Sequence, residues 1–149
     1  MQEFIDKIEN TMEPPLTTLT LPLYLRQKSR QRVILDNGED AGIHLKRGSV
    51  LYNNDLLVSA DETVVKIVAA NERLSVVECE DQLLFARACY HLGNRHMPLQ
   101  IEQNRFYYLH DHVLDEMLRG MGICVAQCSA PFEPEAGAYT RGSTHTHPH

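Results

Sequence analysis

Residues 81–93 read DQLLFARACYHLG, and residues 111–122 read DHVLDEMLRGMG. Each stretch opens with an aspartate, a residue that caps helices by accepting a main-chain hydrogen bond. Apolar residues then recur with the spacing of a half-buried helix. Those of the first helix are Leu84, Phe85, Ala88, Cys89 and Leu92, and those of the second, 29 positions later, are Val113, Leu114, Met117, Leu118 and Met121. The same displacement aligns Gly93 with Gly122, and we expect each glycine to end its helix.

Short strand patterns flank the two predicted helices. One strand, at residues 74–79, precedes the first helix, and another, at residues 123–128, follows the second. Residues 100–102 and 106–109 supply two strands between the helices, with Asn104 at the turn. The order strand, helix, strand, strand, helix, strand is typical of a ferredoxin-like βαββαβ domain. Residues 73–130 are just long enough to bury the modest core of such a domain.

The segments outside this domain have different patterns. Residues 1–72 contain closely spaced short strands, which predict a small all-β sandwich or barrel. The strands are expected at residues 17–25, 32–35, 43–45, 50–52, 56–58 and 63–69, with a turn at 36–38. His44 is expected to be a strand residue facing solvent. Residues 131–149 are rich in proline, glycine and glutamate before they reach the histidines, so we expect a flexible C-terminal tail. The predicted fold class is therefore α+β.

The end of the tail carries the first candidate metal ligands. His145, His147 and His149 occupy alternate positions at the end of the chain. Imidazole is a borderline ligand that suits zinc, copper and nickel. The pattern therefore favours a metal-collecting tail. The alternative is an expression tag, but tags are normally consecutive histidines and this run is interrupted.

Two further histidine positions are candidate ligands. His96 lies in a short loop between Gly93 and Pro98, and spacing alone favours a histidine hydrogen-bonded to the loop main chain over a ligand there. His110 and His112 lie at a strand-to-helix junction. On a strand they would share one face and could bind one metal, whereas on a helix they would diverge. A weak metal site and two solvent-facing histidines both fit. Asp111 between them is a helix cap and need not be a ligand.

The number of donors shows that His96 alone does not complete a metal site. A nickel or copper site takes about four to six donors, and His96 supplies one of them. The others must come from the tail, from waters or from a second chain, and two-fold dimers are the commonest oligomers. Two copies of His96 near a dimer axis would form an open, exchangeable site suited to delivery. The sequence presents no activated nucleophile and no paired acid and base, so we do not expect an enzyme.

Composition excludes several other classes of function. The net charge of -6 argues against nucleic-acid binding, and no apolar run is long enough to span a membrane. Residues 1–10 lack the apolar core of a secretory signal. The four cysteines have no CxxC spacing. We expect them to be reduced, mostly buried thiols of a cytoplasmic protein.

Three segments together resemble the UreE urease accessory protein family. They are GNRHMPLQ at residues 93–100, DHVL at residues 111–114 with Tyr108 before it, and PFEPEAGAY at residues 131–139 ahead of the histidine tail. The resemblance extends over nearly the whole chain, although its motifs are loose in the N-terminal part. It implies a homodimeric nickel metallochaperone in the cytoplasm. The N-terminal β domain would be similar to peptide-binding modules, and the ferredoxin-like domain would bind metal and dimerise.

The resemblance also assigns roles to residues. It implies that His96 is the essential nickel ligand, paired with its counterpart across the dimer axis, which reverses the preference from spacing alone. His110 and His112 match positions where some members carry secondary metal-binding histidines. The tail has three histidines where some members have many more, which argues against high storage capacity. Nickel would pass through an accessory GTPase to the urease apoprotein assembly complex.

Three other functions remain open from the sequence. A zinc or copper buffer without a specific client is one, because copper outranks nickel at most nitrogen and oxygen sites and either ion would bind in vitro. A metallohydrolase is the second, because residues 110–112 match part of an HxHxDH signature, but Tyr108 stands where that signature needs histidine. The third is a peptide-binding module whose metal site is incidental.

Overall fold

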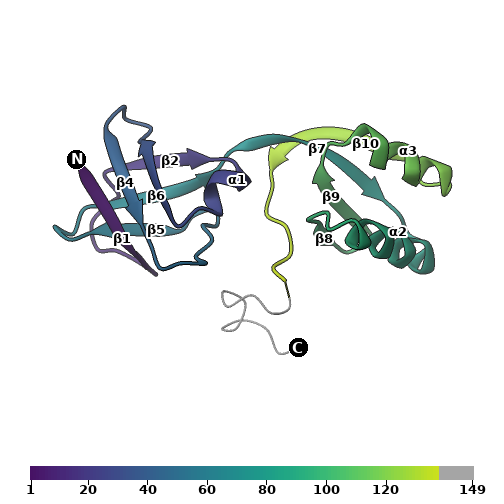
Figure 1. Cartoon of the computed structure of the whole chain (residues 1–149), viewed down its shortest axis with the longest axis horizontal. Coiled ribbons are helices and arrows are strands. Elements are labelled where there is room, and N and C mark those ends of the chain that lie inside the picture. The colour runs from purple at the N-terminus through teal and green to yellow at the C-terminus, as the bar shows by residue number, and fades with distance from the viewer. Residues whose placement is uncertain (138–149) are drawn as a thin grey trace. The chain divides into compact units, whose positions relative to one another are not determined.

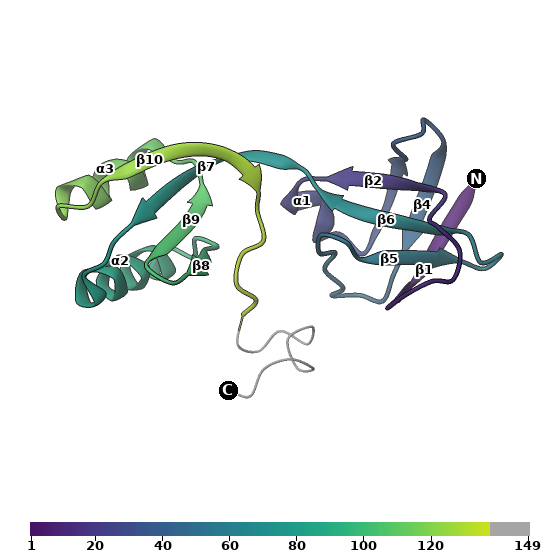
Figure 2. The same ribbon diagram turned by 180° about the vertical axis from the view of Figure 1, so that it is seen from behind.

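The computed structural model describes residues 1–137 and has an α+β fold with two separate sheets. Its contacts divide these residues into unit 1, Met1–Ala70, and unit 2, which begins at Asn71 and ends at Ala136. Figures 1 and 2 show each unit from two sides. Within residues 1–137, no helix has the length and apolar character needed to cross a membrane.

Unit 1 is built on one mixed six-stranded sheet. Its elements are β1 (Gln2–Ile8), β2 (Thr17–Leu21), α1 (Leu23–Arg26), β3 (Arg30–Ile34), β4 (Asp40–His44), β5 (Leu56–Ser59) and β6 (Val64–Ala69). The strand order is β2-β6-β5-β1-β4-β3, with β1 parallel to β4 and β2 parallel to β6. Alternate residues point inward, and the core includes the completely buried Phe4, Ile43, Leu57 and Ile67.

The two outer strands of this sheet, β2 and β3, are joined through Asp36. The main-chain N–H of Asp36 donates to the carbonyl of Thr18 at 3.0 Å. Its Oδ2 atom accepts from the hydroxyls of Thr18 and Thr20 at 2.6 and 2.7 Å. Burial acts to raise the pKa of Asp36, but these hydrogen bonds outweigh it, and the net pKa is below the ordinary value. Asp36, which follows β3, therefore links the two edge strands of the sheet through its hydrogen bonds to β2.

Unit 1 differs from the sequence prediction in three places. Strand β1 was not expected, because residues 1–10 mix charged and apolar residues, yet Phe4 is buried at its centre. The expected strand at residues 17–25 is broken at Pro22, after which α1 begins. Residues 50–52 form no strand. Leu51 lies in a loop with its side chain buried, and its main-chain N–H donates to the Arg26 carbonyl. The placement of His44 is confirmed, since it is exposed on β4 and its Nε2 lies 3.3 Å from Glu3.

Unit 2 has the element order that the sequence predicts. Its elements are β7 (Asn71–Glu78), α2 (Gln82–Asn94), β8 (Gln100–Glu102), β9 (Arg105–Leu109), α3 (His112–Gly120) and β10 (Val125–Pro131). The sheet is antiparallel throughout, in the order β10-β7-β9-β8. Both helices contribute to one core with the sheet, and its completely buried members are Val77, Ala88, Leu92, Phe106, Tyr108 and Leu118. The expected turn is confirmed at Asn104, which has a φ of 61°.

The C-terminal end of unit 2 is held more firmly than a free tail. Strand β10 continues to Pro131, and Phe132 is completely buried. The Glu133 N–H donates to the side chain of Gln100 at 2.9 Å, and the Glu135 N–H donates to the carbonyl of Leu99 at 2.7 Å. Residues 131–135, which were expected to open the flexible tail, are therefore anchored to unit 2.

The cysteines are free thiols, but the prediction that most are buried is wrong. Cys79 is buried, Cys89 and Cys128 are half-buried, and Cys124 is exposed. Cys124 directly precedes β10, and Cys128 lies within that strand. Burial, together with the proximity of Cys79, raises the pKa of the Cys89 thiol, which favours the uncharged form there.

Candidate metal-binding site

His96 lies in the loop that follows α2 and has a left-handed main-chain conformation, with a φ of 58°. The helix continues through Gly93 to Asn94, so the prediction that Gly93 ends it is wrong. The main-chain N–H of His96 donates to the carbonyl of Gly93 at 2.9 Å, and that of Met97 donates to the carbonyl of Leu92 at 3.1 Å. The hydrogen bond that holds His96 in the loop is made by its main chain, and its side chain is exposed.

Helix α3 ends with the same hydrogen-bond pattern but with a glycine. The Gly122 N–H donates to the Arg119 carbonyl, the Ile123 N–H donates to the Leu118 carbonyl, and Gly122 has a φ of 86°. His96 thus occupies the position that Gly122 occupies at the end of α3. A left-handed conformation costs a residue with a Cβ atom roughly 1–2 kcal/mol, and glycine avoids that cost. Costly main-chain conformations in non-glycine residues concentrate at functional sites.

The 29-residue repeat in the sequence does not describe the two helices along their whole length. Their starts are related by 30 positions, because the caps are Asp81 and Asp111, which accept from the N–H groups of Leu84 and Leu114. Their ends are related by 26 positions, because α3 is one turn shorter. The two capping predictions are confirmed. The prediction that Val113 belongs to the half-buried apolar stripe of the second helix is wrong, because its side chain is 68% exposed.

His110 and His112 lie on either side of the helix cap and have different environments. His110 follows β9, and its side chain is only 19% exposed. His112 is the first residue of α3, and it is exposed. Asp111 has an extended conformation, and its Oδ1 atom accepts from the N–H of Leu114 at 3.1 Å. That interaction uses the Asp111 carboxylate as a cap.

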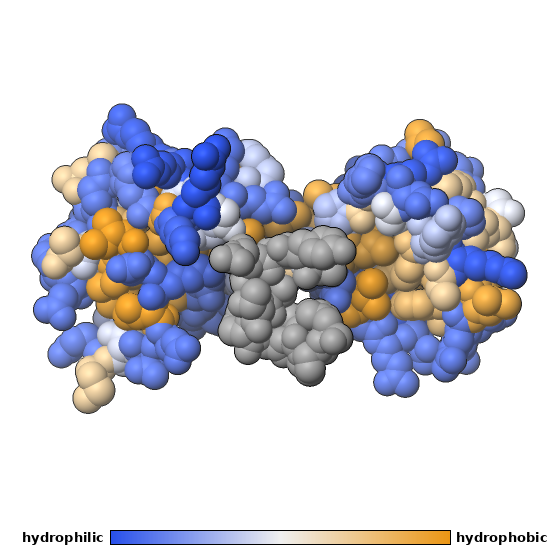
Figure 3. Space-filling view, turned by 60° about the horizontal axis from the view of Figure 1, so that its bottom comes forward, coloured by the Kyte–Doolittle hydropathy of each residue, from blue (hydrophilic) through white to orange (hydrophobic). Residues whose placement is uncertain are grey.

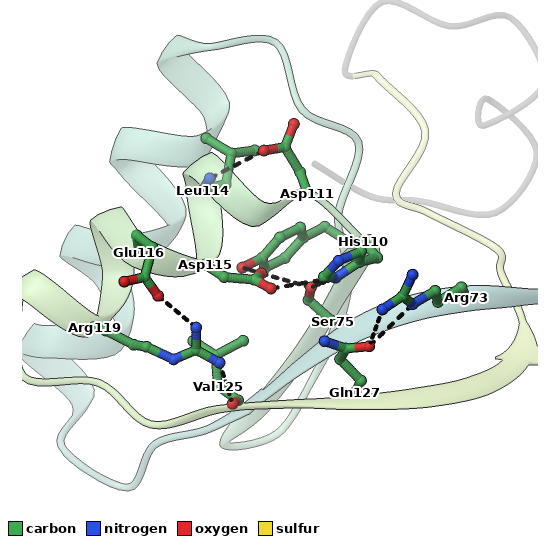
Figure 4. A network of polar contacts seen from close by, with 11 residues as sticks. Arg73, Ser75, His110, Asp111, Leu114, Asp115, Glu116, Arg119, Val125 and Gln127 are labelled. Carbon is green, nitrogen blue, oxygen red and sulfur yellow. Dashed lines mark hydrogen bonds and ion pairs between the residues drawn. The ribbon is translucent and has the colours of Figure 1, made fainter.

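A buried polar network contacts Nδ1 of the His110 ring and was not found from the sequence (Figure 4). Asp115, which is 1% exposed, accepts at Oδ1 from the hydroxyls of Ser75 and Tyr108, each at 2.6 Å. Its Oδ2 atom lies 3.2 Å from Nδ1 of His110, and the Ser75 hydroxyl lies 3.3 Å from the same nitrogen. Burial, together with the hydrogen bond to Asp115 and its charge, raises the pKa of Tyr108 well above its ordinary value. Tyr108 is therefore a hydroxyl donor.

One sequence signal could have revealed this network. Asp115 lies between Leu114 and Leu118 on the buried side of α3, so its carboxylate interrupts an apolar stripe. A carboxylate on a buried face needs hydrogen-bond donors, and here they come from two strands of the sheet. Tyr108, the residue that breaks the metallohydrolase signature, is one of those donors.

The predicted site residues that lie within residues 1–137 do not form one cluster. Among residues 1–137, no group of three or more His, Cys, Asp or Glu side chains is placed to hold a metal ion. His96 follows α2, whereas His110 and His112 lie at the start of α3. The predicted ligands His145, His147 and His149 lie outside the described residues.

Comparison with known proteins identifies the family. Residues 2–70 match the model of the N-terminal domain of the UreE urease accessory protein, and residues 72–149 match the model of its C-terminal domain. The chain is 56% identical over 126 residues to the urease accessory protein UreE of Alkalilimnicola ehrlichii, covering 85% of this chain and 77% of the relative. It is 53% identical over 136 residues to the protein of that name from Citrobacter koseri, covering 89% and 90%, and 53% identical over 131 residues to that from Pseudomonas putida, covering 87% and 79%. These relatives are named as accessory proteins, and the chain belongs to the UreE urease accessory protein family.

Proposed function

We propose that this protein is a cytoplasmic nickel metallochaperone that binds Ni²⁺ between two copies of the chain and delivers it for assembly of the urease active site. Delivery proceeds through an accessory GTPase to the urease apoprotein. The protein acts as a carrier and catalyses no reaction. Family membership supports a role in urease maturation. The identity of the metal and the route of its delivery are what we propose.

The observation that carries the proposal is the conformation of His96. An exposed imidazole stands at a helix end where a glycine would be more stable. A purely structural residue at this position has no reason to keep a Cβ atom, because Gly122 makes the same turn without one. A function for the exposed ring does supply a reason. Neutral imidazole is a good ligand for Ni²⁺, and a surface position allows the ion to leave.

The number of donors supports a two-chain site. His96 gives one nitrogen, and no third or fourth ligand stands beside it among residues 1–137. We propose that His96 of a second copy and the tail residues His145, His147 and His149 complete the coordination, with His110 and His112 as secondary ligands. Because such ligands come from separate segments, the ion is exchangeable, as delivery requires.

We assign the metal-binding and dimerisation roles to a ferredoxin-like domain formed by residues 73–130. Its strand and helix order supports this assignment. Leu83 and Tyr90 are 59% and 64% exposed and lie two turns apart on α2, the helix that leads to His96. Apolar side chains are also visible on the surface of unit 2 in Figure 3. Exposed apolar groups on one helix face suit contact with a second copy. We assign a peptide-binding role toward partner proteins to residues 1–72, and a further supply of histidines to residues 131–149.

Calorimetric titration of Ni²⁺ into the full chain tests the proposal. We expect His96→Ala to abolish the tightest binding step, while sedimentation velocity shows that the dimer persists. His44→Ala is the matched control, because it removes another exposed imidazole from unit 1. Unchanged Ni²⁺ binding in His96→Ala would exclude His96 as the ligand. Loss of the dimer together with the site would make His96 structural.

A zinc or copper buffer without a client is the competing function, and affinity in vitro does not separate the two. Cells that depend on this chain for urease activation do. We expect His96→Ala to lose urease activation and excess nickel in the medium to restore it. A buffer would leave urease activation unchanged in the variant.

A further inference from the structure

We propose that Asp115 is a positioning residue that fixes the His110 ring with its proton on Nδ1, so that Nε2 presents the lone pair to a metal ion. The inference rests on the proposed function, in which His110 is a secondary nickel ligand. It adds the residue that prepares His110 for that role. Figure 4 shows Ser75, His110 and Asp115 converging beneath α3.

The hydrogen bonds around Asp115 determine which atoms carry protons. Both hydroxyls, of Ser75 and of Tyr108, point at Oδ1 of Asp115 at 2.6 Å. The Oδ2 atom is left to face Nδ1 of His110 at 3.2 Å. With Oδ2 as an acceptor, the proton between the two groups belongs to the imidazole.

The second neighbour of Nδ1 leads to the same assignment. The Ser75 oxygen lies 3.3 Å from Nδ1 of His110, but its single proton is already donated to Asp115. Toward the ring it therefore acts as an acceptor. Both groups that face Nδ1 accept, and both require an N–H there. Free neutral histidine prefers its proton on Nε2, so the network imposes the less common tautomer.

The arrangement matches what metal-ligating histidines require. Such a histidine almost always donates its other ring N–H to a carboxylate, a carbonyl or a water, and this bond sets the orientation and basicity of the ligand. Asp115 lies in the first turn of α3, where its main-chain N–H donates to the carbonyl of the cap residue Asp111 at 2.9 Å. The carboxylate is 1% exposed, whereas the His110 side chain is 19% exposed, so the ring is within reach of solvent.

Asp115→Asn is the decisive variant because it keeps the shape of the side chain. The amide oxygen still accepts from Ser75 and Tyr108, and the amide nitrogen then faces His110. Since that nitrogen donates, Nδ1 must accept, and the ring proton moves to Nε2. Tyr108→Phe is the matched control, because it removes one hydrogen bond to Oδ1 and leaves the contact with Oδ2 intact.

Long-range ¹H–¹⁵N spectra of the metal-free full chain report the tautomer directly, because they distinguish a protonated from an unprotonated ring nitrogen. We expect the Nδ1–H form in the unsubstituted chain and in Tyr108→Phe, and the Nε2–H form in Asp115→Asn. The Nε2–H form in the unsubstituted chain would overturn the proposal. That measurement decides the question even where Asp115→Asn fails to fold.

Titration of the same samples with Ni²⁺ tests the consequence for binding. The Ni²⁺ concentration that broadens the His110 ring signals measures the affinity at His110. We expect Asp115→Asn to lower that affinity roughly 10–100-fold and to leave the broadening at His96 unchanged. Broadening at His96 but never at His110 would overturn this inference and leave the proposed function standing. Absence of broadening at both residues would remove the proposed function itself.

Discussion

His96 and Gly122 occupy equivalent positions at the ends of α2 and α3, and both have left-handed main-chain conformations, with φ of 58° and 86°. In each case the next residue, Met97 or Ile123, returns a hydrogen bond to the last buried leucine of its helix. One position carries a side chain that the turn does not need. Comparing substitutions at the two positions therefore distinguishes the stability of the turn from a function of the imidazole.

His96→Gly should raise the free energy of unfolding by roughly 1 kcal/mol and remove nickel binding, because it relieves the left-handed main-chain conformation and deletes the proposed ligand. Urea denaturation followed by far-ultraviolet circular dichroism reports on α2 and α3. Gly122→Ala is the reverse control: its added Cβ meets no atom within 4 Å, so its expected loss of about 1 kcal/mol comes from the main chain alone. A destabilised His96→Gly chain would mean that the ring contributes packing.

Asp111→Ala should lower the free energy of unfolding by about 1 kcal/mol, since it removes the acceptor for the Leu114 N–H. Asp111→Ser keeps a capping oxygen, so its stability should stay within a few tenths of a kcal/mol of the unsubstituted chain. Calorimetry should then show unchanged Ni²⁺ binding in Asp111→Ser. A well-folded serine variant that loses metal would identify Asp111 as a ligand as well as a cap.

Tyr108 should make stability depend on pH in the alkaline range. Its pKa is higher in the folded chain than in the unfolded chain, so the folded state retains a proton that the unfolded state releases above about pH 10. The free energy of unfolding should therefore fall as the pH rises beyond that value. Urea denaturation of Tyr108→Phe beside the unsubstituted chain isolates the effect from the other tyrosines. Parallel pH curves would contradict it.

Asp36 should act in the opposite direction at acid pH. Its pKa is lower in the folded chain than the ordinary value of 3.8, so its contribution is present above that pH and is lost as the pH falls through the folded value. Asp36→Ala should be less stable than the unsubstituted chain at neutral pH, and the gap should narrow in acid. Thermal unfolding at a series of pH values measures both. A gap that is independent of pH would assign the loss to packing.

Removal of residues 143–149 should lower the number of Ni²⁺ ions bound, measured by equilibrium dialysis, and leave the urea midpoint unchanged. The anchored segment from Phe132 to Glu135 is retained in that variant. Unchanged stoichiometry would mean that the tail supplies no ligand.

Ni²⁺ binding to the full chain should weaken as the pH drops through about 6.5, because protonated imidazole does not bind metal.

Local signals predicted local structure well. Asp81 and Asp111 were recognised as caps because a cap depends only on the next three residues, and the strand and helix order of unit 2 followed from apolar spacing. The C-terminal end of α2 was harder to predict, because Gly93 is a common helix terminator and His96 is a rare one. Strand β1 was not predicted, because its stability comes from pairing with β4 and β5, which lie far along the sequence.

The network around His110 shows why long-range sites resist prediction. Asp115 finds its partner Ser75 at a distance of 40 residues along the chain, and only the pairing of β7 with β9 places Ser75 beside Tyr108. The sequence marked His110 as a candidate from its spacing with His112. It gave no sign that the two rings would differ in burial, which follows from their positions on either side of the Asp111 cap.

The hydrogen bond from Glu135 to Leu99 ties the outgoing chain to a point three residues from His96. His145 follows Glu135 by ten residues, so covalent geometry alone keeps it within roughly 36 Å of that anchor. In the proposed site, tail histidines confined in this way meet an ion at His96 as an intramolecular event, at an effective concentration set by the tether and independent of how dilute the protein is. Lengthening the tether beyond Glu135 would tune capture of the ion without altering a single ligand.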